Sequence, residues 1–447
     1  MKAKFMQLFR LQPGEGSLVF VLGFALLANA VAMQIAGIVS ISGFLKFGGV
    51  NSILIVLFVD YAFILITGAL QTLVIDKFTR KDLILWITLL FASLFVFLRL
   101  MFLFNAPDWL NYSLMYILAE QQFILFPLVF WVLANDIFKI SQAKRVFPVI
   151  SGWNFAGKLI GIGIAAISPM LFANLGIETE EILTINTFVY LLAFMVLWTG
   201  LRKTEVRKTV TQTETLGETL REGWDFMSNV PSFRFMMYTI LALAVADTII
   251  EFRFLVVTDS VFTDQASYQT FFSMYRLGIT LLSLILQAFV TSVLIKYMQL
   301  KNTFLFFPVV AFAGAVAMIL LPGVNIAIAV MAGVKLIRDT INESGRKSFQ
   351  GLVPEERRGR VSTLMESYLP SIGTMLACVA GYAIVYVGEI LGVSVVLWYL
   401  LVAAVGGVFA LWAVLKMRKV YDDSLYNWRL KRRQRKTQTV LLDKLTD

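Results

Sequence analysis

The chain has 447 residues, of which 58% are hydrophobic and 15% are charged. A soluble domain carries about 25% charged residues, so this composition excludes a soluble enzyme, a disordered protein and a secreted disulfide scaffold. The single cysteine, Cys378, excludes a disulfide within the chain, and the absence of histidine removes the commonest transition-metal ligand. We therefore expect a polytopic membrane protein that is not an enzyme, with no metal site and no cofactor.

Apolar runs long enough to cross a bilayer as helices recur along the whole chain. A span needs about 20 predominantly apolar residues, because every backbone polar group must be bonded within the helix. The pattern predicts an all-α membrane protein with twelve transmembrane helices. The predicted spans are 17–39, 52–75, 82–104, 109–134, 148–173, 182–200, 235–257, 267–293, 303–321, 324–345, 361–387 and 391–415.

The charged residues orient these spans. Most of the 39 Lys and Arg residues fall in the N-terminal segment, in alternate loops and in the tail, whereas the opposite loops contain Lys46 and several acids. Basic residues concentrate on the cytoplasmic side of membrane proteins, so both termini are expected to be cytoplasmic. The net charge of +10 then reflects topology, and we expect no nucleic acid partner.

The longest predicted loop, 201–234, divides the chain into six spans and six. Leu216, Leu220, Trp224 and Met227 recur at helical spacing there and indicate an amphipathic helix on the membrane surface, with a plain charged linker as the alternative. We expect an N-terminal half (1–200), this linker (201–234), a C-terminal half (235–415) and a basic cytoplasmic tail (416–447). This layout is that of the major facilitator superfamily of secondary transporters.

A short motif between the second and third spans agrees with that layout. Residues 76–81 (DKFTRK) resemble the superfamily's D-R-x-G-R-R/K loop. In such a loop a carboxylate at a helix end pairs with basic residues of its neighbour, and the pair opens when the halves move. Asp76 and Arg80 are the residues expected to form this cytoplasmic latch.

Ionisable residues within the spans are the main functional candidates, since each costs at least about 2.5–3.5 kcal/mol at mid-membrane. Three cations are expected to bind an anionic substrate, together with Glu120 and Gln121 of the fourth span: Lys158, Arg276 and Lys335. The others are expected to couple or gate transport: Asp60, Asp247, Glu251, Arg253, Arg338, Asp339 and Glu366. The alternative is that these charges, which nearly balance, form ion pairs between helices.

Several segments carry a resemblance to one transporter family. Residues 130–138 (FWVLANDIF) and 142–148 (QAKRVFP) resemble the F-W-x-x-A-N-[DQ]…A-K-R-x-[FY]-P signature of the ATP/ADP translocase family. Residues 248–254 (TIIEFRF) and 354–360 (PEERRGR) are similar to two further motifs of that family. The resemblance carries Asn135, Lys144 and Arg145 over as cytoplasmic motif residues.

The resemblance implies a twelve-helix exchanger in a bacterial cytoplasmic (inner) membrane that moves a nucleotide or a related organic anion by alternating access. Its partners would be this small molecule and membrane lipids. Family members that exchange ATP carry basic residues in the first helix, where residues 32–39 (AMQIAGIV) are uncharged here. Either Lys158, Arg276 and Lys335 replace them, or the substrate differs.

Two other functions stay open at this point. The uncharged first helix and the 14% aromatic content permit a proton-coupled carrier or flippase for an amphipathic or lipid-like substrate. A membrane sensor or scaffold with a blocked cavity is the third class, and the ionisable residues within the spans argue against it.

Overall fold

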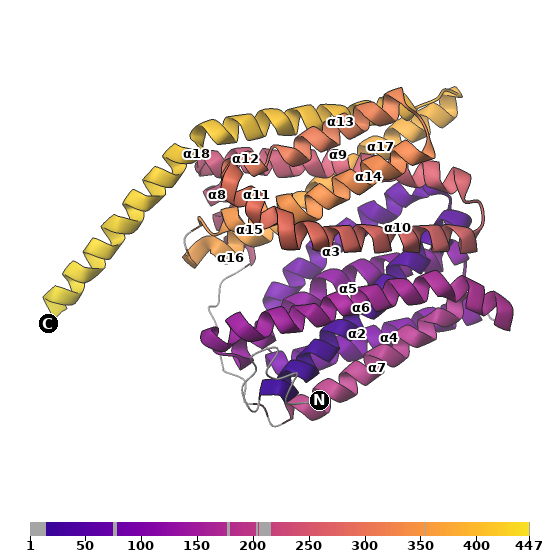
Figure 1. The fold of residues 1–447 in the computed structure, drawn as a ribbon, viewed down its shortest axis with the longest axis horizontal. Coiled ribbons are helices and arrows are strands. Elements are labelled where there is room, and N and C mark those ends of the chain that lie inside the picture. Colours follow the sequence, from indigo (N-terminus) through magenta and orange to yellow (C-terminus); the bar gives the residue numbers. More distant parts are fainter. Residues whose placement is uncertain are drawn as a thin grey trace. The chain divides into compact units, whose positions relative to one another are not determined.

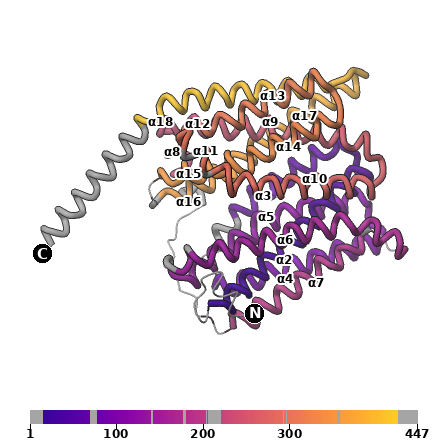
Figure 2. Tube along the Cα trace, viewed as in Figure 1, coloured from indigo at the N-terminus to yellow at the C-terminus, as the bar shows by residue number. Residues whose placement is uncertain are grey.

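A computed structural model describes residues 15–74, 78–176, 179–202, 204, 216–353 and 355–446. Over these ranges the regular structure is helical, which confirms the predicted all-α class (Figures 1 and 2). The helices are α2 (Glu15–Gly48), α3 (Ile53–Val74), α4 (Arg80–Leu103), α5 (Asp108–Ile137), α6 (Ile140–Leu175), α7 (Ile182–Leu201), α8 (Leu216–Asn229), α9 (Pro231–Val261), α10 (Gln265–Ile285), α11 (Ser292–Met298), α12 (Leu300–Thr303), α13 (Phe306–Leu320), α14 (Val324–Ile337), α15 (Glu343–Gln350), α16 (Glu355–Thr363), α17 (Leu369–Leu391) and α18 (Val396–Thr446).

Ten helical stretches among the described residues are long and apolar enough to cross a bilayer, and they coincide with ten of the predicted spans. The other two predicted spans, 235–257 and 324–345, are also helical. The first lies in α9, and the second covers α14 and its continuation into α15. These are the two spans that contain most of the intramembrane charges.

Three π-helical turns interrupt the second half of the chain: Leu286–Thr291, Arg338–Asn342 and Leu364–Tyr368. A π-helical turn contains one more residue than an α-helical turn, so it rotates the side chains that follow it, and such turns are frequent at functional sites. The second one begins at Arg338, within the charged part of the tenth predicted span.

The chain forms two compact units, which we describe separately. The first contains residues 1–213 and 258–280, and the second contains residues 214–257 and 281–447. In the first unit α2 packs against α5, α6 and α7 (Figure 1). Because these neighbours bury most of its length, α2 is apolar around its whole circumference, as a buried helix requires.

Two glycines set how closely α6 approaches α2. A Cβ added at Gly157 would lie 2.5 Å from the Leu27 carbonyl oxygen, and one at Gly161 would lie 2.6 Å from that of Val31. Small residues four apart allow two membrane helices to pack backbone to backbone. α6 therefore packs directly against the backbone of α2.

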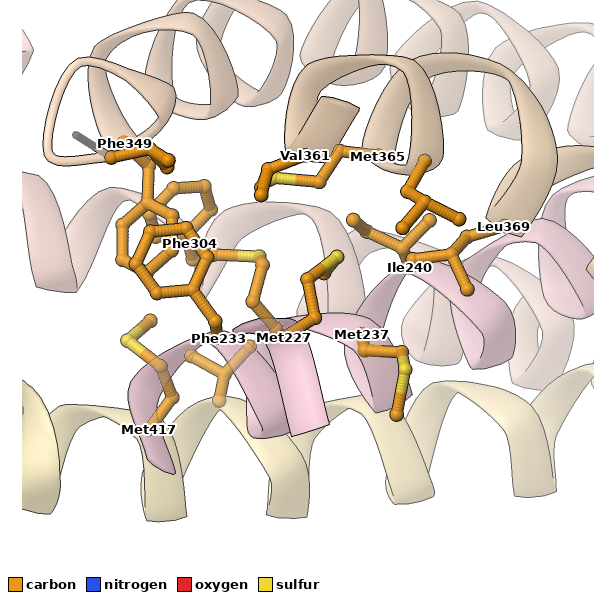
Figure 3. Packing of buried hydrophobic residues seen from close by; sticks show 14 of the residues in the cluster. Met227, Phe233, Met237, Ile240, Phe304, Phe349, Val361, Met365, Leu369 and Met417 are labelled. Atoms are coloured by element: carbon orange, nitrogen blue, oxygen red, sulfur yellow. The ribbon is translucent and has the colours of Figure 1, made fainter. Parts of the chain in front are cut away.

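In the second unit α8 is attached to the ends of several helices by an apolar cluster (Figure 3). Met227 of α8 is 1% exposed and lies in this cluster with Phe233 and Phe349, whereas Trp224 is 47% exposed. A helix, α8, thus occurs within the predicted linker, and its place on the membrane surface stays a prediction. One edge of its apolar face packs against the protein, and the side chains of Leu216 and Leu220 lie outside the described residues.

Gly161→Ala is expected to destabilise the protein, because the added methyl group would clash with backbone atoms of α2. Relieving this clash requires the whole helix to shift. Overpacking of this kind costs about 1–3 kcal/mol. Gly163→Ala is the matched control, since a Cβ at Gly163 meets nothing within 4 Å on the same helix. Thermal unfolding of the purified variants measures the difference, and equal melting temperatures would contradict the packing described here.

Candidate functional site

In the second unit, ion pairs join α9 to the charged part of the tenth predicted span. Lys335 Nζ lies 3.0 Å from Glu251 Oε1, and the Arg338 guanidinium lies 2.5 Å from Asp247 Oδ2. Arg338 also contacts Asp339, its neighbour in sequence, at 2.7 Å. We call these five residues the charge ladder.

The ladder follows from helical spacing. Asp247 and Glu251 are four residues apart and share one face of α9, while Lys335 and Arg338 are three apart where α14 meets its π-helical turn. Because the two acids and the two bases are each spaced one turn apart on their helices, two ion pairs form, Lys335–Glu251 and Arg338–Asp247. We call each of these ion pairs a rung. Lys335, predicted to bind substrate, thus has a carboxylate partner of its own.

Arg253 lies two residues after Glu251 on α9. Its guanidinium donates a hydrogen bond to the Tyr399 hydroxyl of α18 at 3.2 Å. Phe252 packs its ring against the same tyrosine edge to face. Arg253 therefore contributes to the packing of α9 on α18, and the gating role predicted for it stays a prediction.

Arg276 of α10 belongs to the first unit and has a different environment. Its guanidinium donates to Gln34 Oε1 of α2 at 3.3 Å and lies 5.1 Å from the centre of the Phe272 ring. In the described part of the chain no carboxylate lies within ion-pair distance of it. Arg276 is therefore a part-buried cation without a protein counter-charge.

The position of Arg276 depends on a glycine of α2. A Cβ added at Gly37 would lie 3.1 Å from the Arg276 guanidinium, so only glycine leaves the guanidinium its full space there. The sequence identified Arg276 as a candidate but did not point to Gly37. Gly37 lies about one turn after Gln34 on α2, so both residues face Arg276. Nothing in the sequence around Gly37 indicates that it lies beside an arginine of another helix.

Asp60 of α3 is fully buried in the first unit. The charged group that acts on it is Glu120 and the polar one is Gln121, both of α5. The Thr67 hydroxyl lies 2.8 Å from Gln121 Oε1. Three predicted residues, Asp60, Glu120 and Gln121, are thus brought together. The substrate-binding role predicted for Lys158 of α6 stays a prediction.

The predicted cytoplasmic residues form three separate contacts. Arg80 pairs with Asp136 at 2.8 Å, and Asn135 donates to the Trp131 carbonyl of its own helix. Arg145 pairs with Glu15 at 2.7 Å. Asp76 and the Lys144 side chain lie outside the described residues.

Glu366, predicted to gate, lies in a polar network at the start of the eleventh predicted span. It accepts bonds from Arg346 at 2.8 Å and from Gln350 at 2.6 Å. Nearby, Arg360 pairs with Glu222 of α8. These contacts tie α8, α15 and α16 together within the second unit.

No cluster of three or more metal-ligating side chains occurs among the residues that the structure describes. The arrangement offers two kinds of chemistry instead. Paired charges can separate and re-form, and a cation without a partner can hold an anion.

The fold is similar to that of several solved transporters. A nucleoside transporter, NupG, superposes with a TM-score of 0.64 at 14% identity, covering 89% of this chain and 99% of that one. An auto-inhibited POT family peptide transporter gives 0.62 at 11% identity, with 90% and 96% covered. A bacterial homologue of the iron transporter ferroportin gives 0.62 at 14% identity, with 91% and 99% covered. These likenesses show that the chain shares the fold of these solved transporters, in agreement with the bundle predicted from the sequence.

No family model and no curated protein sequence matches the chain. The resemblance to the ATP/ADP translocase family therefore rests on the motifs quoted above.

Removing one partner of the Lys335–Glu251 rung is expected to destabilise the protein more than removing both. A part-buried charge left alone costs about 3–5 kcal/mol, so Lys335→Gln and Glu251→Gln should each lower the melting temperature. The double variant should recover much of the loss, with a coupling energy of about 0.5–3 kcal/mol.

The exposed Lys347–Glu343 pair of α15 is the control, since such a pair contributes about 0.3–0.5 kcal/mol. A double-mutant cycle of thermal unfolding at both pairs makes the comparison. Equal coupling energies at the two pairs would mean that the ladder is no more than a solvated surface contact.

Proposed function

We propose that the protein is a secondary transporter of the ATP/ADP translocase type, which moves a nucleotide or a related organic anion by alternating access. The fold supports a transporter, and the motifs at 130–148, 248–254 and 354–360 support the family. In this proposal Arg276 binds the anionic group of the substrate, and the charge ladder and the cytoplasmic pairs open and close during the cycle.

The observation that carries the proposal is the environment of Arg276. A cation near mid-membrane needs an opposite charge, and the residues described around it supply an amide oxygen and an aromatic face. A phosphate or carboxylate oxygen of a substrate would complete the site, because a guanidinium presents several N–H donors that match such an anion bidentately.

The remaining basic residues have other tasks in this account. Lys335 and Arg338 are neutralised by Glu251 and Asp247, so they hold α9 against the tenth span and are available to an anion only when a rung opens. Arg80 and Arg145 each bind an acid at the cytoplasmic end of the first unit. In this proposal an entering anion reaches Arg276 without displacing a carboxylate, since none of the described carboxylates pairs with it.

A thermal-shift experiment tests the binding step. A ligand that binds only the folded protein stabilises it by about 2.7 kcal/mol at one hundred times its dissociation constant. ATP, ADP and inorganic phosphate should raise the melting temperature of the wild type, and Arg276→Gln should abolish the shift. Lysophosphatidylcholine, a zwitterionic amphiphile, should give no Arg276-dependent shift.

Arg99→Gln is the matched control, because Arg99 pairs with Glu181 near the end of α4 and has no role in anion binding here. It should keep the shift with nucleotides. A shift in wild type that survives Arg276→Gln would remove Arg276 from the site. A shift with the lysolipid alone would favour the carrier for amphipathic substrates.

A further inference from the structure

The strongest feature that the proposed function leaves unexplained is the buried carboxyl of Asp60. Its side chain has no exposed surface. Among the described residues neither oxygen has a hydrogen bond of ordinary geometry, and the polar group that acts on the carboxyl is the Gln121 amide. Native proteins rarely bury even a neutral polar group without a partner, and an unpaired carboxylate costs far more than a neutral acid does in such a place.

Among the described residues, the groups that act on Asp60 are an acid and an amide. α5 contributes the Glu120 carboxyl and the Gln121 amide. α2, which also packs against α3, has no charged side chain between residues 16 and 45, and Asp60 is the one charged residue of α3. A like charge such as that of Glu120 disfavours ionisation of the buried Asp60 carboxyl.

Gln121 provides a partner for either protonation state. The Thr67 hydroxyl lies 2.8 Å from both the Phe63 carbonyl oxygen and Gln121 Oε1, yet it has one hydrogen to donate. If Thr67 donates to Phe63, the amide is reversed: Gln121 Nε2 donates to Thr67, and Oε1 turns towards Asp60. The two amide orientations are not distinguished by heavy-atom positions. One orientation presents a donor to an ionised Asp60 and the other an acceptor to a protonated one.

We propose that Asp60 is the proton-binding site of the transporter, neutral while the surrounding helices bury it and ionised when the cycle exposes it to water. In the exposed state the O–H bond of the carboxyl breaks and the proton passes to water. On closure a proton is taken up from the side that was last open. Gln121 is the positioning residue that reverses its amide between the two states.

This inference deepens the proposed function by naming its coupling ion. A proton carried on Asp60 offsets one negative charge of an anion carried on Arg276, so the substrate would move together with a proton. The two sites are on different helices of the first unit, α3 and α10, and each can be tested without the other.

Infrared spectroscopy of the purified protein in lipid vesicles tests the proposal without any substrate. At about pH 7 ordinary aspartates are ionised, so a carboxylic acid C=O band assigned to Asp60 should be present in wild type and completely absent from Asp60→Asn. Transfer to D₂O should shift that band, because a transported proton must exchange with solvent. Asp136→Asn is the control and should remove no acid band, since Asp136 is paired with Arg80.

Either of two results would overturn the proposal. One is no difference in the acid region between wild type and Asp60→Asn, which would mean that Asp60 is ionised. The other is a band that does not shift in D₂O, which would mean a permanently locked structural acid. If Asp60→Asn does not fold, Asp60→Glu should move the band instead of removing it, and an unmoved band would count against the assignment. Failure of anion binding at Arg276 leaves all of these outcomes unaffected.

Discussion

The low dielectric of a membrane span requires that each charge within it find an opposite charge, a proton or a ligand. This constraint sorts the ionisable residues of the protein into three groups. The charge ladder satisfies it internally, through Lys335–Glu251 and Arg338–Asp247. Among the described residues Arg276 has no carboxylate partner, and Asp60 has no cation partner and is contacted by the Gln121 amide alone. Arg276 is proposed to bind an anion because it needs a negative charge, and Asp60 is proposed to bind a proton because it needs its own charge neutralised.

The ladder and Arg276 behave differently because their helices have different neighbours. α9 and the tenth span present acids and bases at matched helical spacing, so ion pairs form directly between them. Arg276 instead faces α2, a helix that is buried along most of its length and has no charged side chain between residues 16 and 45. The polar atom that α2 offers is Gln34 Oε1, and Gly37 leaves the space. The absence of basic residues from the first helix is thus a consequence of burial, and it does not remove the cation from the first unit.

Much of this was predictable from the sequence. Apolar runs located the helices, and the i, i+4 spacing of Asp247 and Glu251 placed both acids on one face. The sequence could not say which acid pairs with which base, because that register depends on how α9 packs and on the π-helical turn at Arg338. The near balance of acidic and basic residues within the spans was also misleading, because it says nothing about where they lie. Arg338 contacts two acids, whereas none of the described carboxylates pairs with Arg276. The neighbourhood of Asp60 depends on side chains about 60 residues away, which no local pattern reports.

The central claim is that Arg276 binds an anion that the protein moves across the membrane. Counterflow in proteoliposomes tests it most directly: vesicles loaded with unlabelled ATP are given labelled ADP outside, with wild type and Arg276→Gln compared at equal incorporation. The account predicts transient accumulation of label by the wild type and none by Arg276→Gln. Equal accumulation by both proteins would contradict the role of Arg276, and no accumulation by the wild type with any nucleotide would contradict the translocase assignment itself.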